Sequence, residues 1–193
     1  TMTRDSSNGD RINIKAGTDE VLSAAIDLTS YGSPAADKPL IFQGYTSSAG
    51  DGGIGGISGG GSVSVFSGSN SYVQFCDLHC HNCGSATVLS VTGGFGVTVI
   101  NVEIDNTTGD GVRFTGGTIR NCNFHNIGGI GAHQTSGQPG YVADSYFKNG
   151  ANKFSAAIEL YREASAIRNC ISIDGASDGI ITTSYARRIE ANS

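Results

Sequence analysis

One short phrase, repeated four times, constrains the fold of this chain more than any other feature of its sequence. Each copy has an apolar residue, a gap, Asn or Asp, a small residue and then alternating positions that end at a turn-forming polar residue. The copies occupy residues 99–106, 119–126, 142–149 and 167–174, with the Asn or Asp at positions 101, 121, 144 and 169. The steps of 20, 23 and 25 residues fit one supersecondary unit with loops of variable length. The repetition predicts a solenoid.

The segments between these copies indicate which kind of solenoid to expect. Residues 111–115, 129–133, 157–161 and 179–183 mostly alternate in polarity and begin with Gly or another small residue. Two or three strands in every 20 to 25 residues leave no room for a helix, which excludes the helical repeat classes. The pattern therefore predicts a parallel β-helix, whose coils stack about 4.8 Å apart. The repeated Asn or Asp would form a ladder at a bend, since both residues tolerate left-handed backbone.

The Asn-Cys-x-Phe phrase at 121–124 and the Asp-Gly-Ile/Val phrases resemble right-handed parallel β-helix proteins of the pectate-lyase-like superfamily, over about residues 10–190. The resemblance implies an all-β, right-handed parallel β-helix of about seven coils. That superfamily includes polysaccharide lyases, polygalacturonases, phage tailspikes and non-catalytic surface proteins, so it favours polysaccharide as a partner without fixing the chemistry. It also favours an extracellular or virion-associated location, for a monomer or a homotrimer.

Length and charge set further expectations. A chain of 193 residues is expected to form a single β-helix domain, 1–193, because a solenoid core grows by addition of coils. Residues 188–192 begin another copy of the phrase that stops, so we expect a fragment of a longer chain. The net charge of −5 argues against nucleic acid as a partner. No apolar run approaches the length of a membrane span, and neither a membrane partner nor a cofactor is expected.

Polar residues on the strands of residues 111–115, 129–133 and 157–161 form the candidate site. If Val112, Ile130 and Ile158 face the interior, the outward residues within three coils include Arg113, His133, Glu159 and Tyr161. We assign His133, Glu159 and Tyr161 as candidate catalytic residues, and Arg113, Arg162 and Asp178 as candidate substrate-binding residues. This alignment places Gly131 between Arg113 and Glu159, and predicts a gap there about 9.6 Å wide.

The residue types of this candidate site suit glycan chemistry. A lyase needs a cation such as Arg113 to neutralise a uronate and a base such as His133 or Tyr161, whereas a hydrolase needs two carboxylates. The paired aspartates typical of polygalacturonases and the calcium-binding aspartates of pectate lyases have no counterpart in the sequence. Two functions stay open: a protein that binds and also cleaves a glycan, and a non-catalytic solenoid of a spike, stalk or surface protein.

The segment 76–83 contains three cysteines and two histidines, and raises the question of a metal. Strand alternation would place Cys76 and Cys80 on one face and His79 and His81 on the other, so that they could not converge on one ion. We therefore predict buried thiols and no metal, with Cys76, Cys122 and the later Cys170 in interior positions. A disulfide between Cys80 and Cys83 stays open.

A second outward column is predicted from the same alignment. It contains His79, Asp105, His125 and Lys148. The first three could bind a metal ion, or the column could consist of opposite-charge pairs between neighbouring strands. We favour pairing.

Overall fold

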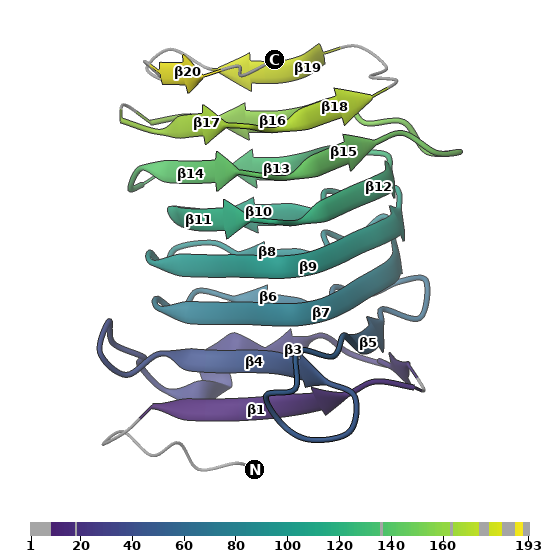
Figure 1. Ribbon diagram of the computed structural model, residues 1–193, viewed down its shortest axis with the longest axis vertical. Coiled ribbons are helices and arrows are strands. Elements are labelled where there is room, and N and C mark those ends of the chain that lie inside the picture. Colours follow the sequence, from purple (N-terminus) through teal and green to yellow (C-terminus); the bar gives the residue numbers. More distant parts are fainter. Residues whose placement is uncertain are drawn as a thin grey trace.

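The computed structural model describes residues 9–17, 19–135, 137–162, 164–173, 178–182 and 188–190. Figure 1 shows strands stacked along one axis from β1 to β20, with each coil of the chain lying on the preceding one. The neighbouring named strands within these ranges pair in parallel. The predicted all-β parallel β-helix is confirmed.

The strands form a 13-stranded sheet and a 7-stranded sheet, here called the first and the second sheet. The main path of the first sheet is β1 (Asp10–Lys15), β4 (Leu40–Tyr45), β7 (Val73–Gly84), β9 (Val97–Thr107), β11 (Gly117–Arg120), β14 (Gly140–Ala143), β17 (Ala166–Arg168) and β20 (Arg188–Glu190). Its other strands are β2 (Glu20–Val21), β5 (Gly55–Ser58), β12 (Asn123–Ile127), β15 (Tyr146–Lys148) and β18 (Ile171–Ile173). The second sheet contains β3 (Ile26–Asp27), β6 (Phe66–Gly68), β8 (Leu89–Val91), β10 (Val112–Phe114), β13 (Ile130–Gln134), β16 (Ala156–Leu160) and β19 (Asp178–Thr182). A 3₁₀ turn, η1 (Leu28–Tyr31), follows β3.

The predicted Asn/Asp ladder lies at a bend of the first sheet. Asn101, Asn121, Asp144 and Asn169 all have left-handed backbone, with φ of 54°, 53°, 51° and 49°. The ladder extends to Asp77, whose φ is 56° and whose Oδ1 accepts a hydrogen bond of 2.7 Å from Asn101 Nδ2. Asn and Asp are used here because they adopt this conformation at low cost and their side chains can bond to one another between coils.

The bend resets the alternation of inward and outward residues. Phe75 and Leu78 are both buried although three positions separate them, because Asp77 between them is left-handed. The register pairs Leu78 with Val102 and Cys76 with Ile100. The predicted alignment of this coil was therefore wrong by two residues: Leu78, and not Cys76, occupies the interior column.

Aromatic and aliphatic side chains fill the space between the sheets. Phe124 and Phe147 stack with ring centroids 4.6 Å apart and planes 2° from parallel. Burial of each such ring stabilises the fold by about 1.5–3 kcal/mol. Stacking of like residues on successive coils thus supplies the cohesion that the sequence repeat predicts.

The cysteines are free thiols, and no disulfide links Cys80 to Cys83. Cys80, Cys83 and Cys122 are buried, whereas Cys76 and Cys170 are only half-buried. The interior prediction was right for Cys122 and wrong for Cys76, which lies on the outward side of the bend. Burial raises the pKa of Cys122 to about 12 and that of Cys83 to about 11, so these thiols are poor nucleophiles.

Candidate functional site

The predicted polar residues of the second sheet form one outward row. Arg113 on β10 pairs in register with His133 on β13, and His133 pairs with Glu159 on β16. Parallel strands in register direct such residues to the same side, about 4.8 Å apart. Arg113, His133 and Glu159 are therefore consecutive members of a single row.

The predicted gap at Gly131 is wrong. Val112 pairs with Ala132, and not with Ile130, so the interior column of β13 is displaced by two residues from the predicted one. Gly131 is packed inward, where an added Cβ would lie 2.8 Å from the ring of Phe147. The imidazole of His133 takes the middle position of the row instead.

Asp110, which sequence reasoning missed, organises this row. Its Oδ2 accepts hydrogen bonds from Arg113 Nη2 at 2.7 Å and from His133 Nδ1 at 2.8 Å. Its Oδ1 accepts one from the amide of Ile130 at 2.9 Å. The Asp110 side chain is only 10% exposed. One nearly buried carboxylate thus holds the side chains of Arg113 and His133 and the backbone of the next coil at Ile130.

The electrostatics of Asp110 follow from these contacts. Burial alone would raise its pKa, but the hydrogen bonds from His133, the Ile130 amide and Arg113 outweigh burial and lower the pKa to about 2. Asp110 is thus ionised at neutral pH. A sequence signal for it existed, because Asp110 begins an Asp-Gly-Val phrase that corresponds to Asp-Gly-Ile at 178–180.

Glu159 and Tyr161 complete the row on β16 and just beyond it. The negative charge of Glu159, and a hydrogen bond to it, raise the pKa of Tyr161, whose side chain therefore keeps its proton at neutral pH. Tyr161 is 38% exposed and its ring centroid lies 6.4 Å from that of His133. The buried Gln134 holds the Tyr161 amide through Oε1 at 2.9 Å, which fixes the backbone at the edge of the row.

The remaining predicted residues lie at the margins of the row. Arg162 is exposed and follows Tyr161 directly. Asp178 begins β19, and its backbone pairs with Ala156, which places it at the entry of the sheet in the same column as Asp110. The conformation of the Asp178 side chain lies outside the described part of the structure.

This arrangement supports defined chemistry. Asp110 binds Nδ1 of His133, and so orients the ring and leaves Nε2 as the nitrogen that can exchange a proton with a ligand. Arg113 supplies a planar cation that is 41% exposed, while Glu159 supplies an acceptor and Tyr161 an aromatic face. Cation, imidazole, carboxylate and phenol thus occur along about 10 Å of one surface.

The second predicted polar column lies on the first sheet, and its residues differ in part from those predicted. The register pairs His81 with Asp105, Asp105 with His125, and His125 with Lys148. His79, which was predicted to lie in this column, pairs instead with Glu103. The wrong assignment of His79 has the same cause as that of Cys76, namely the left-handed backbone of Asp77 in β7.

The family of this chain follows from comparison with known proteins. The family model described as "Right handed beta helix region" matches residues 87–193, which is more than half of the chain. A search of curated proteins and a search of solved structures each gave no match. Among the described residues, no helix has the length and apolar character needed to cross a membrane. With parallel coils in the structure and a family model over more than half of its length, the chain belongs to the right-handed β-helix family.

Proposed function

We propose that the row of Arg113, His133, Glu159 and Tyr161 binds a glycan that carries carboxylate groups. The observation that carries this proposal is the nearly buried Asp110, which holds both Arg113 and His133 in place. A side-chain pair that is fixed before a ligand arrives loses little conformational entropy on binding.

Each member of the row has a role that matches an acidic sugar. The guanidinium of Arg113 presents further N–H donors to a uronate carboxylate. Glu159 accepts hydrogen bonds from sugar hydroxyls, and the exposed ring of Tyr161 packs against the apolar face of a pyranose. The row spans about 10 Å, roughly the length of two sugar units. The resemblance to pectate-lyase-like proteins supports the same class of ligand.

If the bound glycan is cleaved, His133 is the candidate base. Its Nε2 is the nitrogen that is not bonded to Asp110, and in β-elimination it would take the proton from C5, next to the uronate carboxylate. The glycosidic C4–O bond would break as a C4–C5 double bond forms, and the leaving oxygen would take a proton from water. Hydrolysis would use Glu159 with a second carboxylate. The proposed function is glycan binding, and the same experiment also shows whether the bound glycan is cleaved.

A screen of acidic and neutral glycans on an array, followed by titration calorimetry of each hit, tests binding. Arg113→Ala and Tyr161→Ala should each weaken binding of an acidic glycan at least tenfold and leave the melting temperature nearly unchanged. Arg11→Ala is the matched control, because Arg11 is an exposed arginine on β1 of the first sheet. Absorbance of an unsaturated product, or new reducing ends, would reveal cleavage, which should then be lost in His133→Gln.

Three results would overturn the proposal. They are failure to bind any glycan, binding that Arg113→Ala leaves intact, and loss of binding only on Arg168→Ala. Arg168 lines a polar hollow on the first sheet together with Arg120, Tyr141, Asp144 and Asn169, so the last result would transfer the site to that hollow. The first result would favour a non-catalytic structural solenoid.

A further inference from the structure

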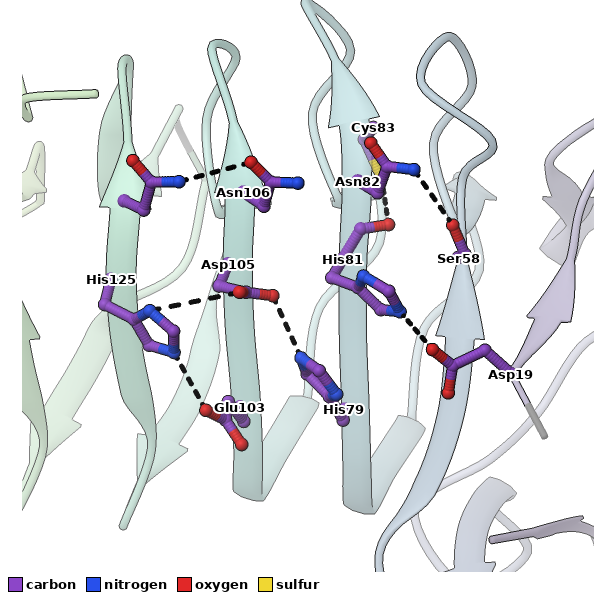
Figure 2. Close-up of polar contacts among 11 residues, drawn as sticks. Asp19, Ser58, His79, His81, Asn82, Cys83, Glu103, Asp105, Asn106 and His125 are labelled. Carbon is purple, nitrogen blue, oxygen red and sulfur yellow. Dashed lines mark hydrogen bonds and ion pairs between the residues drawn. The ribbon is translucent and has the colours of Figure 1, made fainter. Parts of the chain in front are cut away.

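Three of the four histidines of the chain lie together on the outer face of the first sheet, away from the proposed glycan row. His79 and His81 are two positions apart on β7 and His125 lies on β12 (Figure 2). Each has a carboxylate within hydrogen-bonding distance: Asp105 for His79 at 2.9 Å, Asp19 for His81 at 2.7 Å and Glu103 for His125 at 2.8 Å.

We propose that His79, His81 and Asp105 form a binding site for a divalent transition-metal ion such as Zn²⁺. One ligand atom from each of these residues lies within 4.8 Å of the other two. Ligands bound tetrahedrally at about 2.1 Å from zinc are about 3.4 Å apart. Rotation about side-chain bonds is therefore sufficient to close the set, and the backbone of the sheet need not move.

The strand geometry prepares the two imidazoles. His79 and His81 point to the same side of β7, and their rings are stacked with centroids 4.5 Å apart and planes 12° from parallel. Left-handed residues on either side, Asp77 and Asn82, fix where the strand bends. Two neutral nitrogens and one carboxylate, with a fourth position for water, match the ligand types and number that zinc takes in open sites.

The surrounding carboxylates act on this set in two ways. Asp19 binds Nε2 of His81 at 2.7 Å, which leaves Nδ1 as the ring nitrogen available to a metal, and the carboxylate orients the ring as outer partners of metal-bound histidines do. Asp105 lies between His79 and His125 (Figure 2), with Oδ2 3.9 Å from Nδ1 of His125. Asp105, Asp19 and Glu103 together give the cluster a negative charge when its histidines are neutral, and this attracts a cation.

The cation is expected on the β7 side of Asp105. On the other side, His125 pairs in register with Lys148 of β15, whose positive charge would repel a metal ion. The side chains of His79, His81 and Asp105 are 30%, 19% and 20% exposed. The site is thus partly shielded from bulk water and still open to an entering ion.

The thiols of the same strand are not part of this set. Cys80 lies between the two histidines in the sequence but is buried on the opposite face of β7. Burial raises its pKa far above the ordinary value, which opposes the thiolate form that zinc requires. The proposed ligands are therefore nitrogen and oxygen only.

Calorimetric titration of Zn²⁺ into the chelator-treated, untagged chain, under reducing conditions, tests the site. We expect one ion per chain, and at least a tenfold weaker affinity for His79→Ala, His81→Ala and Asp105→Asn. Asp19→Asn should weaken affinity by a smaller factor, since Asp19 acts through His81. Asp37→Asn is the matched control, because it removes an exposed carboxylate in the turn that precedes β4, and it should bind as the unmodified chain does.

Absorption of the Co²⁺-substituted chain provides a measurement that needs no variant. Nitrogen and oxygen ligands give visible d–d bands without the near-ultraviolet band of a cobalt–thiolate bond. A thiolate band, no binding of Zn²⁺, or an affinity that the three ligand variants leave unchanged would each overturn the proposal. In any of these cases the cluster is a ladder of His–carboxylate hydrogen bonds that joins coils.

Discussion

Replacement of Asp110 by Asn tests how the proposed glycan row is held together. The pKa of Asp110 is about 2 in the folded chain, against an ordinary value of 3.8. This difference corresponds to about 2 kcal/mol of stabilisation at pH 7, and partial access of solvent reduces it to about 1–2 kcal/mol. Because folding lowers the pKa, the stabilisation is complete above about pH 4 and is lost as the pH falls from about 4 to about 2.

Urea unfolding followed by circular dichroism, at pH 7 and at pH 3, measures this effect. Asp110→Asn should lower the free energy of unfolding by about 1–2 kcal/mol at pH 7, and the difference from the unmodified chain should fall by about half at pH 3. Asp37→Asn, at an exposed loop position, should show no difference at either pH. An effect of Asp110→Asn that is the same at both pH values would refute the argument, because the carboxylate charge would then contribute nothing.

Three further predictions concern the scaffold. Asn101→Ala should cost about 1–2 kcal/mol because φ at this bend is positive, and Asn101→Gly should cost less, as measured by urea unfolding. Gly117→Ala should destabilise the chain by at least about 2 kcal/mol in the same assay, since its Cβ would lie 2.0 Å from the Val97 carbonyl oxygen; an unchanged midpoint would contradict this. With a polar disulfide reagent, the half-buried Cys170 should be labelled before the buried Cys122, and the reverse order would count against the described burial.

The sequence repeat was sufficient to predict the fold and the bend. The Asn or Asp at 101, 121, 144 and 169 recurs because a left-handed position in every coil admits few residue types at low cost. This requirement is local, so a single chain displays it without any structure. The parallel β-helix follows because only short strands fit between successive bends.

Strand register was harder to predict. Alternation of inward and outward residues was assumed to continue through β7 and β13. The left-handed Asp77 interrupts it in β7, and two consecutive buried residues, Gly131 and Ala132, interrupt it in β13. Because the effect of Asp77 was not anticipated, Cys76 and His79 were assigned to the wrong columns. In β13, Gly131 was predicted at the position of the candidate row that His133 occupies. A shift of this kind reassigns every residue of a strand to the other face or to another column.

Contacts that join different coils were the least predictable part of the candidate site. Asp110 bonds Arg113 three residues away on its own coil, and also His133 and Ile130 of the next coil. The distance in sequence between Asp110 and His133 depends on the length of the loop between two strands, which varies from coil to coil. Nothing in the local pattern around Asp110 predicts its second and third partners.

The same contacts determine which substitutions separate a structural role of the row from a binding role. After Arg113→Ala, Asp110 keeps the hydrogen bonds from His133 and from the Ile130 amide, so little of the stability provided by that carboxylate is lost. After His133→Ala, a nearly buried carboxylate loses the bond that contributes most to its low pKa, and stability and binding would fall together. Arg113→Ala therefore tests glycan binding with little accompanying change in stability. The loss in the free energy of unfolding measured for Asp110→Asn is the upper limit of what Arg113→Ala can lose through this carboxylate.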